Sequence, residues 1–339
     1  MAAQHSAQRS PWPRVGAIVL LLTALLSLIM IAFAWPATRS TVHDIPLAVA
    51  GPPPATAQVV QQLQANRPGA FEVTTVADTA AAEALIKDRK VYGAIDLTTG
   101  HPQVIVASAA SPAVAQALQQ VAQALGQSGA GAPVVRDLVP LPADDPRGAG
   151  LAAGALPLVL GGIVAAGLLT NLIAGIGRRV AGALAFAITG GLALTAILQY
   201  WLGSLEGDYW TNSGVVALSI GATAFTLLGL EALLGAAGLG LGAAVMMLLG
   251  NPLSGLTSAP EMLPSGWGAF GQFLPPGAAG SLLRSTAFFD GAGSGAHLLV
   301  LSAWAVFGLL LVGAAGLRRA GTGRGTPTPA AERETVSAA

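Results

Sequence analysis

The sequence predicts an all-α polytopic membrane protein of six transmembrane helices, with an inserted α/β extracytoplasmic domain and a re-entrant outer helical hairpin. Apolar residues make up 53% of the chain and charged residues only 9%, which excludes an ordinary soluble domain. Several apolar runs reach the length of about 20 residues that a helix needs to cross the hydrocarbon core. Residues 41–126 instead have mixed polarity and alternate strand and helix patterns, which indicates a separate α/β domain.

The expected segments run from a cytoplasmic N-terminus to a disordered cytoplasmic tail. They are the N-terminus 1–14, the first transmembrane helix 15–35, the extracytoplasmic α/β domain with its linker 36–149, the five-helix transmembrane domain 150–317, which includes the outer hairpin 251–295, and the tail 318–339.

Five apolar runs are long enough to cross the membrane, and a sixth is short. They are 15–35, 150–176, 180–203, 213–234, the short run 235–250 and 296–317. Lys and Arg accumulate on the cytoplasmic side of membrane proteins. The basic clusters beside these runs share that side only if the short run also crosses; they are Arg9 with Arg14, Arg178 with Arg179, and Arg318 with Arg319. Six crossings of a bacterial plasma membrane leave both termini in the cytoplasm and make 235–238 a tight cytoplasmic turn.

The first span has an alternative interpretation. Ala32, Phe33 and Ala34 resemble a signal-peptidase site behind a basic N-terminal segment. The apolar run is longer than the core of a usual signal peptide, which favours an uncleaved anchor.

The α/β domain shows its expected elements in order. Strands are expected at 45–50, 71–76, 91–97 and 103–107, and helices at 58–64, at 79–86 behind the N-cap Asp78, and at 112–125. Ser111 and Gly126 supply a start and a stop for the last of these helices. Its apolar stripe packs either on the domain's own sheet or on a partner or membrane surface. Residues 127–148, rich in Gly and Pro, are expected to be a linker.

The segment between the last two spans is apolar but cannot form one continuous helix. Prolines interrupt it, at Pro252, Pro260, Pro264, Pro275 and Pro276. Aromatic residues that favour a membrane boundary are interspersed, at Trp267, Phe270, Phe273, Phe288 and Phe289. Irregular backbone is tolerated at membrane depth only where protein or water supplies hydrogen bonds. The pattern predicts short helices that dip into the outer leaflet and return, or else an extracellular loop packed on the outer domain.

The order of these parts resembles that of type-2 ABC export permeases, and among them the phage-infection-protein-like membrane proteins. Residues 78–96 (DTAAAEALIKDRKVYGAID) resemble the outer-domain helix and strand of that group. The outer hairpin is similar in 251–255 (NPLSG), 260–264 (PEMLP), 274–276 (LPP) and Arg284. The resemblance covers nearly the whole chain.

The resemblance implies one half of a permease that moves a hydrophobic or lipid-like molecule outward. Two copies, or this chain and a sister chain, would form a homodimer or heterodimer driven by a separate ATPase that binds the ATP. The chain cannot supply the ATPase, because its only lysines, Lys87 and Lys90, do not belong to a phosphate-binding loop. Many such permeases have an amphipathic helix before the first span, whereas this segment is short and contains Pro11 and Pro13. ATPase docking therefore depends on Arg178 and Arg179.

The residues expected to line the substrate pathway or its gate lie in the outer hairpin, apart from one carboxylate inside a span. They are Glu231, Asn251, Pro252, Pro264, Trp267, Pro275, Pro276 and Arg284. Glu231 is either a boundary residue or a gating residue. Arg284 pairs with Glu261 or with lipid headgroups, or extends to the interface as an exposed cation.

Other classes of function are less well supported by the sequence. The order of Ser254 and His297 resembles the serine–histidine dyad of rhomboid intramembrane proteases, but with Pro252 where that pattern has glycine. A non-transporting envelope scaffold or surface receptor is a further alternative. The chain has no cysteine, its four histidines are far apart, and its charges balance, so no metal site and no nucleic-acid partner are expected.

Overall fold

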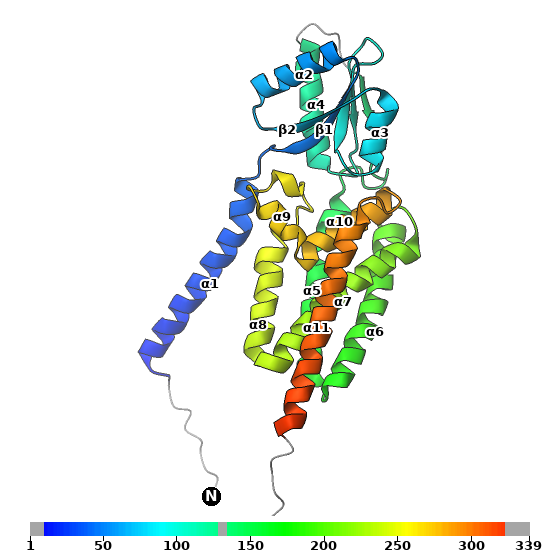
Figure 1. Ribbon diagram of the computed structural model, residues 1–339. Helices are drawn as coiled ribbons and strands as arrows, with labels where there is room; N and C mark the ends of the chain where they lie inside the picture. The colour runs from blue at the N-terminus through cyan, green and yellow to red at the C-terminus, as the bar shows by residue number, and fades with distance from the viewer. Residues whose placement is uncertain (1–9, 128–133, 323–339) are drawn as a thin grey trace, which may run out of the picture.

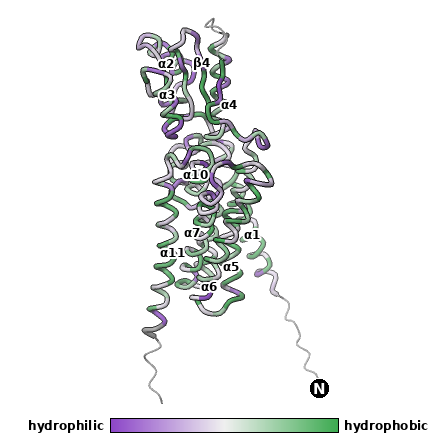
Figure 2. The backbone as a smooth tube through the Cα atoms, turned by 90° about the vertical axis from the view of Figure 1, so that its right-hand side faces the viewer, coloured by the Kyte–Doolittle hydropathy of each residue, from purple (hydrophilic) through white to green (hydrophobic). Residues whose placement is uncertain are grey.

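A computed structural model describes residues 10–127 and 134–322. A sheet domain stands on one end of a layer of long helices (Figure 1). The hydropathy colouring separates the two parts, with apolar residues dominating the helices (Figure 2). We call the end of the helices beneath the sheet domain the near pole. The far pole is the opposite end, where residues 173–175 and Gly235 connect neighbouring helices (Figure 1). Arg9 and most of the tail lie outside the described residues.

Five helices in the described part of the chain are long and apolar enough to cross a membrane. They are α1 (Trp12–Thr38), α5 (Ala149–Leu172), α6 (Ile176–Ala196) with the π-helical turn η1 (Ile197–Trp201), α7 (Tyr209–Leu234) and α11 (Ser294–Thr322). The expected short span 235–250 is a shorter apolar helix, made of α8 (Ala236–Ala244) and the π-helical turn η2 (Val245–Gly250). The prediction of a helical, multi-pass membrane protein is confirmed.

Helix α7 is the centre of the helical layer. Of its most apolar stretch 78% is buried inside the chain, against 0% for α1. Small residues let neighbouring backbones approach α7 directly. A Cβ atom on Gly308 of α11 would lie only 2.3 Å from the Phe225 carbonyl carbon of α7. The turn after α7 depends on Gly235, whose φ of +67° favours glycine.

The sheet domain contains five strands in the order β2-β1-β3-β4-β5. They are β1 (Ile45–Ala50), β2 (Phe71–Val76), β3 (Gly93–Asp96), β4 (Gln103–Val106) and β5 (Val134–Asp137). All neighbours are parallel except β3 and β4, which are antiparallel. The predicted α/β domain is confirmed, but β5 lies in the stretch expected to be a linker.

Helices cover both faces of the sheet (Figure 1). On one face lie α2 (Pro53–Asn66) and α4 (Pro112–Gln127), and on the other lies α3 (Thr79–Lys87). The apolar stripe of α4 packs on the domain's own sheet, since Val114, Leu118 and Val121 share a core with β4. Helix α4 continues through Gly126 to Gln127, the last described residue before the gap.

The broken segment after η2 is attached to the sheet domain. The Thr41 amide donates to the Met262 carbonyl over 3.0 Å, and the Ser111 hydroxyl donates to the Ser258 carbonyl over 2.6 Å. Ala259 is fully buried in the core formed by β1, α2 and α4. These residues pack on the sheet domain, which is the contact that the alternative of a loop packed on the outer domain predicts.

Beyond this attachment the segment forms short helices, η3 (Pro260–Met262), α9 (Trp267–Gln272) and α10 (Pro275–Phe288). Pro275 and Pro276 begin α10, where a missing amide hydrogen costs nothing. Phe289, expected at a membrane boundary, is instead 5% exposed in the core between the sheet and α3. The expectation for Phe289 is wrong because the sheet domain sits directly above the end of α10.

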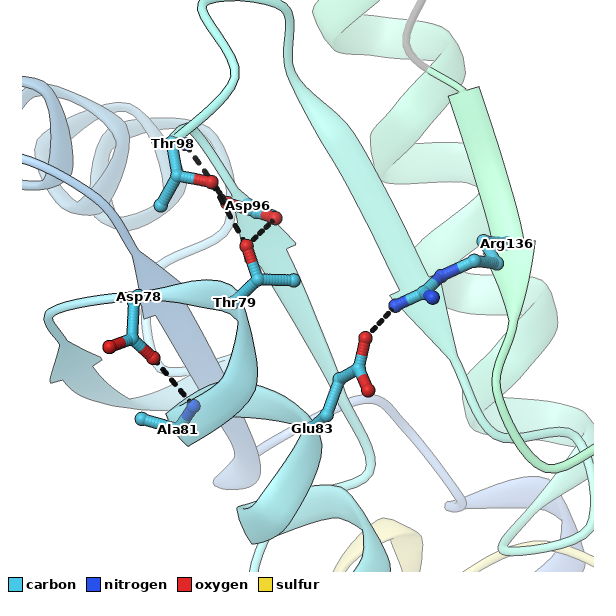
Figure 3. A network of polar contacts seen from close by, with 7 residues as sticks. All are labelled: Asp78, Thr79, Ala81, Glu83, Asp96, Thr98 and Arg136. Atoms are coloured by element: carbon cyan, nitrogen blue, oxygen red, sulfur yellow. Dashed lines mark hydrogen bonds and ion pairs between the residues drawn. The ribbon is translucent and has the colours of Figure 1, made fainter.

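A polar network fastens α3 to the sheet (Figure 3). The buried carboxylate of Asp96 accepts hydrogen bonds from the Thr79 hydroxyl at 2.6 Å and from the Thr98 amide at 2.9 Å. Asp78 accepts from the Ala81 amide at 2.8 Å and caps the helix as predicted. Burial acts to raise the pKa of Asp96, but the bonds from Thr79 and Thr98 outweigh burial and lower it.

We expect Asp96→Asn to destabilise the protein by about 1–3 kcal/mol at neutral pH, because charge-assisted bonds to a buried carboxylate are lost. The lowered pKa means that the wild-type advantage is present above the ordinary aspartate pKa of about 4. It should disappear as pH falls through the lowered pKa. Reversible unfolding in mixed micelles, followed from neutral pH downward, measures this difference. Glu72→Gln, which removes an exposed carboxylate of β2, serves as the control; a gap that persists in acid would contradict the prediction.

Candidate functional site

A polar cavity of about 400 Å³ lies between the sheet domain and the helices α9 and α10. Its walls come from both parts of the chain. The ionisable residues that line it are His43, Asp44, Arg89, Lys90, Tyr92, Glu261, Arg284 and His297. Of the predicted pathway residues, only Arg284 lines this cavity.

Arg89 extends from the sheet domain into the helical layer. It follows α3 with a φ of +58°, a strained conformation for a residue with a side chain. Its Nη1 donates to the Ser281 carbonyl at 2.8 Å and to the Ser285 hydroxyl, and its guanidinium lies 5.4 Å from the centre of the Phe289 ring. Burial lowers the pKa of Arg89, while Tyr92 and Glu261 oppose the shift.

Tyr92 and Glu261 form the second link across the cavity. The Tyr92 hydroxyl donates to Glu261 Oε2 over 2.7 Å. Burial, followed by the effect of the Glu261 carboxylate, raises the pKa of Tyr92, so its hydroxyl stays protonated and donates. This bond corrects the expected pairing of Glu261 with Arg284.

Arg284 is 5% exposed, so the expectation of an exposed interfacial cation is wrong. Its Nη2 donates to the Leu256 carbonyl at 3.2 Å, and its Nε has no hydrogen-bond partner among the described residues. No ion pair joins Arg284 to a carboxylate in the described part of the chain. The guanidinium is therefore a buried charge that the described carboxylates do not neutralise.

A second cavity of about 410 Å³ lies beside the near-pole end of α1. The predicted pathway residues Asn251 and Pro252 line it together with Phe33 of α1 and Leu156 of α5. Ser254 also lines it and donates to the Asn251 carbonyl at 2.8 Å.

Four other predicted pathway residues shape the near pole and line neither cavity. Trp267 is 41% exposed and packs edge to face on Trp35, with ring centres 5.6 Å apart. Pro276 packs its ring against Gly250, and Pro275 is buried beside it. Pro264 precedes α9, and its carbonyl accepts from the Trp267 amide at 2.9 Å.

Glu231 lies at the far pole, away from the other predicted pathway residues. Arg179 Nη1 donates to Glu231 Oε2 at 3.0 Å, and the two side chains are 18% and 15% exposed. The ion pair joins the start of α6 to the end of α7. Arg178, the other predicted docking residue, is exposed.

Ser254 and His297 are not paired in the structure. Ser254 bonds to backbone groups in the second cavity, whereas His297 lines the polar cavity. Among the described residues no hydrogen bond connects them, and this arrangement lacks the contact that a serine–histidine dyad needs.

Comparisons with protein-family models, with curated proteins and with solved structures find no significant match for this chain. The functional interpretation therefore depends on the geometry. The sequence patterns do not single out Arg89 and Tyr92 as cavity residues, although both lie in the 78–96 stretch that carries the family resemblance. The sequence does contain a pattern that could have drawn attention to this loop. Basic residues, Lys87, Arg89 and Lys90, lie at the end of the helix immediately before the strand.

We expect Arg89→Ala to lower the free energy of unfolding by about 1–3 kcal/mol, since it removes charge-assisted bonds between the two parts. Hydrogen exchange in α10 should rise at the same time. Arg89→Gly is the matched control, because it removes the same contacts but relieves the positive φ and should be about 1 kcal/mol less damaging. Equal exchange in α10 for wild type and Arg89→Ala would contradict an anchoring role.

Proposed function

We propose that this chain is the membrane subunit of an ABC-type export system that moves a hydrophobic or lipid-like substrate outward with a separate ATPase. The observation that carries the proposal is the polar cavity at the near pole, enclosed jointly by the sheet domain and the short helices α9 and α10. A ligand that leaves the membrane on this side meets a covered, charged chamber before it reaches water. The exposed Arg178 at the far pole offers an ATPase a basic contact at the opposite end.

The same geometry supports a proposal of six crossings. The start of α1, the 173–175 connection, the turn between α7 and α8 and the end of α11 all lie toward the far pole, with α1 set apart from the other helices (Figure 1). Helix α8 with η2 then leads from the Gly235 turn to Asn251, beside the near-pole end of α1. We assign the far pole, with its basic clusters, to the cytoplasm. The exposed aromatic residues of α9 favour a re-entrant position at the outer boundary.

Dimer formation is part of the proposal. Helix α1 diverges from the other helices, and none of its most apolar stretch is buried (Figure 1). Lipid and a second permease half, either a second copy or a sister chain, would cover this surface.

One observation favours the alternative of a scaffold or surface receptor. Strand β5 forms an edge of the sheet, and its residues Val134 and Val135 are 62% and 42% exposed. An apolar edge strand is a common site for adding a strand from a partner protein. A receptor would use this edge and need no ATPase.

The crossing number can be tested cleanly, because the chain contains no cysteine. We expect single cysteines in Thr99→Cys and Ser265→Cys to react with a membrane-impermeant maleimide on intact cells. Ala174→Cys and Ala237→Cys, at exposed far-pole positions, should react only after the cells are opened. Labelling of Ala237→Cys from outside would contradict six crossings.

Transport requires an ATPase partner. We expect the chain purified gently from its native membrane to retain a nucleotide-binding subunit with a Walker A sequence, detected by mass spectrometry. Arg178→Glu should reduce the retained subunit by at least about tenfold, because it reverses a charge at the docking contact. Lys87→Glu, an equal reversal on the sheet domain, is the control. A chain that purifies without such a subunit would favour the receptor.

A further inference from the structure

The charges around the polar cavity do not balance. Arg89 and Arg284 both line it, and neither forms an ion pair with a carboxylate among the described residues. The Glu261 carboxylate accepts the Tyr92 hydroxyl instead. Lys90 pairs with Asp88 in a position where both side chains are more than half exposed. Asp44, the other carboxylate that lines the cavity, is 76% exposed and lies beside His43. Two guanidinium groups therefore face the cavity without a carboxylate ion pair among the described residues.

An uncompensated buried charge is costly, and Arg284 is the clearer case. It combines near-complete burial with an Nε that has no partner within the described ranges. The Leu256 carbonyl occupies only one of its donors. Proteins retain a buried cation of this kind where an anion completes its hydrogen bonds.

We propose that the cavity binds the phosphate group of an anionic lipid, with Arg284 as the principal ligand and Arg89 as the second positive charge. A guanidinium has a planar set of donors that matches phosphate oxygens in pairs, which favours phosphate as the anion. The volume of about 400 Å³ lies at the lower end of the range for small-molecule sites, so a headgroup fits and acyl chains stay outside.

The surroundings favour a lipid over free phosphate as the source. The cavity wall includes Gly268 and Ala269 of α9. The same short helix exposes Trp267 and Phe270, at 41% and 44%, and Phe273 follows it at 67%. Such aromatic residues occupy the headgroup level of a bilayer, where acyl chains can run alongside them.

The inference deepens the proposed function by naming an anionic phospholipid as the substrate class, and it rests on that proposal only for the direction of transport. Binding itself needs neither an ATPase nor a crossing count. Loss of lipid binding and loss of the ATPase subunit are therefore separate results.

The test uses the full chain, delipidated in a neutral maltoside detergent. It is titrated by calorimetry with dihexanoyl-phosphatidylglycerol in one arm and with inorganic phosphate in the other. The wild type and Lys87→Gln, which removes an exposed charge of α3, should bind the lipid equally. Arg284→Gln should weaken lipid binding by at least about tenfold, and Arg284→Lys should weaken it less, because it retains the charge but loses the planar donors.

Several results would overturn the proposal. They are no detectable lipid binding, equal binding by wild type and Arg284→Gln, or inorganic phosphate binding as tightly as the lipid, which would exclude a lipid as the source. Thermal unfolding without lipid provides a further check. Since no described carboxylate pairs with Arg284, lipid-free Arg284→Gln should melt no lower than wild type. The lipid should raise the melting temperature of wild type and of Lys87→Gln by more than that of Arg284→Gln. A lower melting temperature for lipid-free Arg284→Gln would show that the guanidinium stabilises the fold by itself.

Discussion

Insertion of the Arg89 guanidinium into the layer beneath it holds the two parts of this molecule together. The segment that it reaches follows a chain of short helices and turns that begins after η2. Irregular backbone of this kind needs hydrogen-bond partners from elsewhere in the protein wherever water does not reach it. Arg89 binds the Ser281 carbonyl, Thr41 binds the Met262 carbonyl, and Ser111 binds the Ser258 carbonyl. The outer hairpin therefore depends on the sheet domain for its conformation, and the cavity exists only where the two meet.

Local patterns are sufficient to predict most of the elements. Strands β1 and β2 agree with the expected residues, and α3 begins at the predicted cap because Asp78 binds the Ala81 amide. The failures have a common physical origin in long-range pairing. Strand β5 is four residues long and is defined by its ladder with β4, which periodicity cannot reveal. Phe289 is apolar in either environment, and only the position of the sheet domain decides that protein covers it.

Only part of the site can be predicted from the sequence, because its contacts also depend on long-range pairing. Arg284 stands out in the sequence as a lone cation among apolar residues, but its partner depends on which carboxylate is free, and Tyr92 occupies Glu261. The position of Arg89 beside the helices follows from the topology of the sheet. Helix α1 leads directly into β1, and β3 is parallel to β1, so the N-terminal ends of both strands face the helices. The loop before β3, which carries Arg89, must then point toward the helices. That deduction requires the β1–β3 pairing, which the sequence alone does not establish.

The way in which α1 is attached limits how it can move. None of its most apolar stretch is buried by the described residues, whereas its other end continues through residues 39–44 straight into the central part of the sheet. In that short connection Ser40 and Thr41 both bind the Met262 carbonyl, and His43 binds the Leu263 carbonyl. The helix is thus held at its near-pole end, and any sideways displacement grows along its length toward the far pole. A force applied at the far-pole tip would be delivered as torque to this connection, whose Ser40 lines the second cavity.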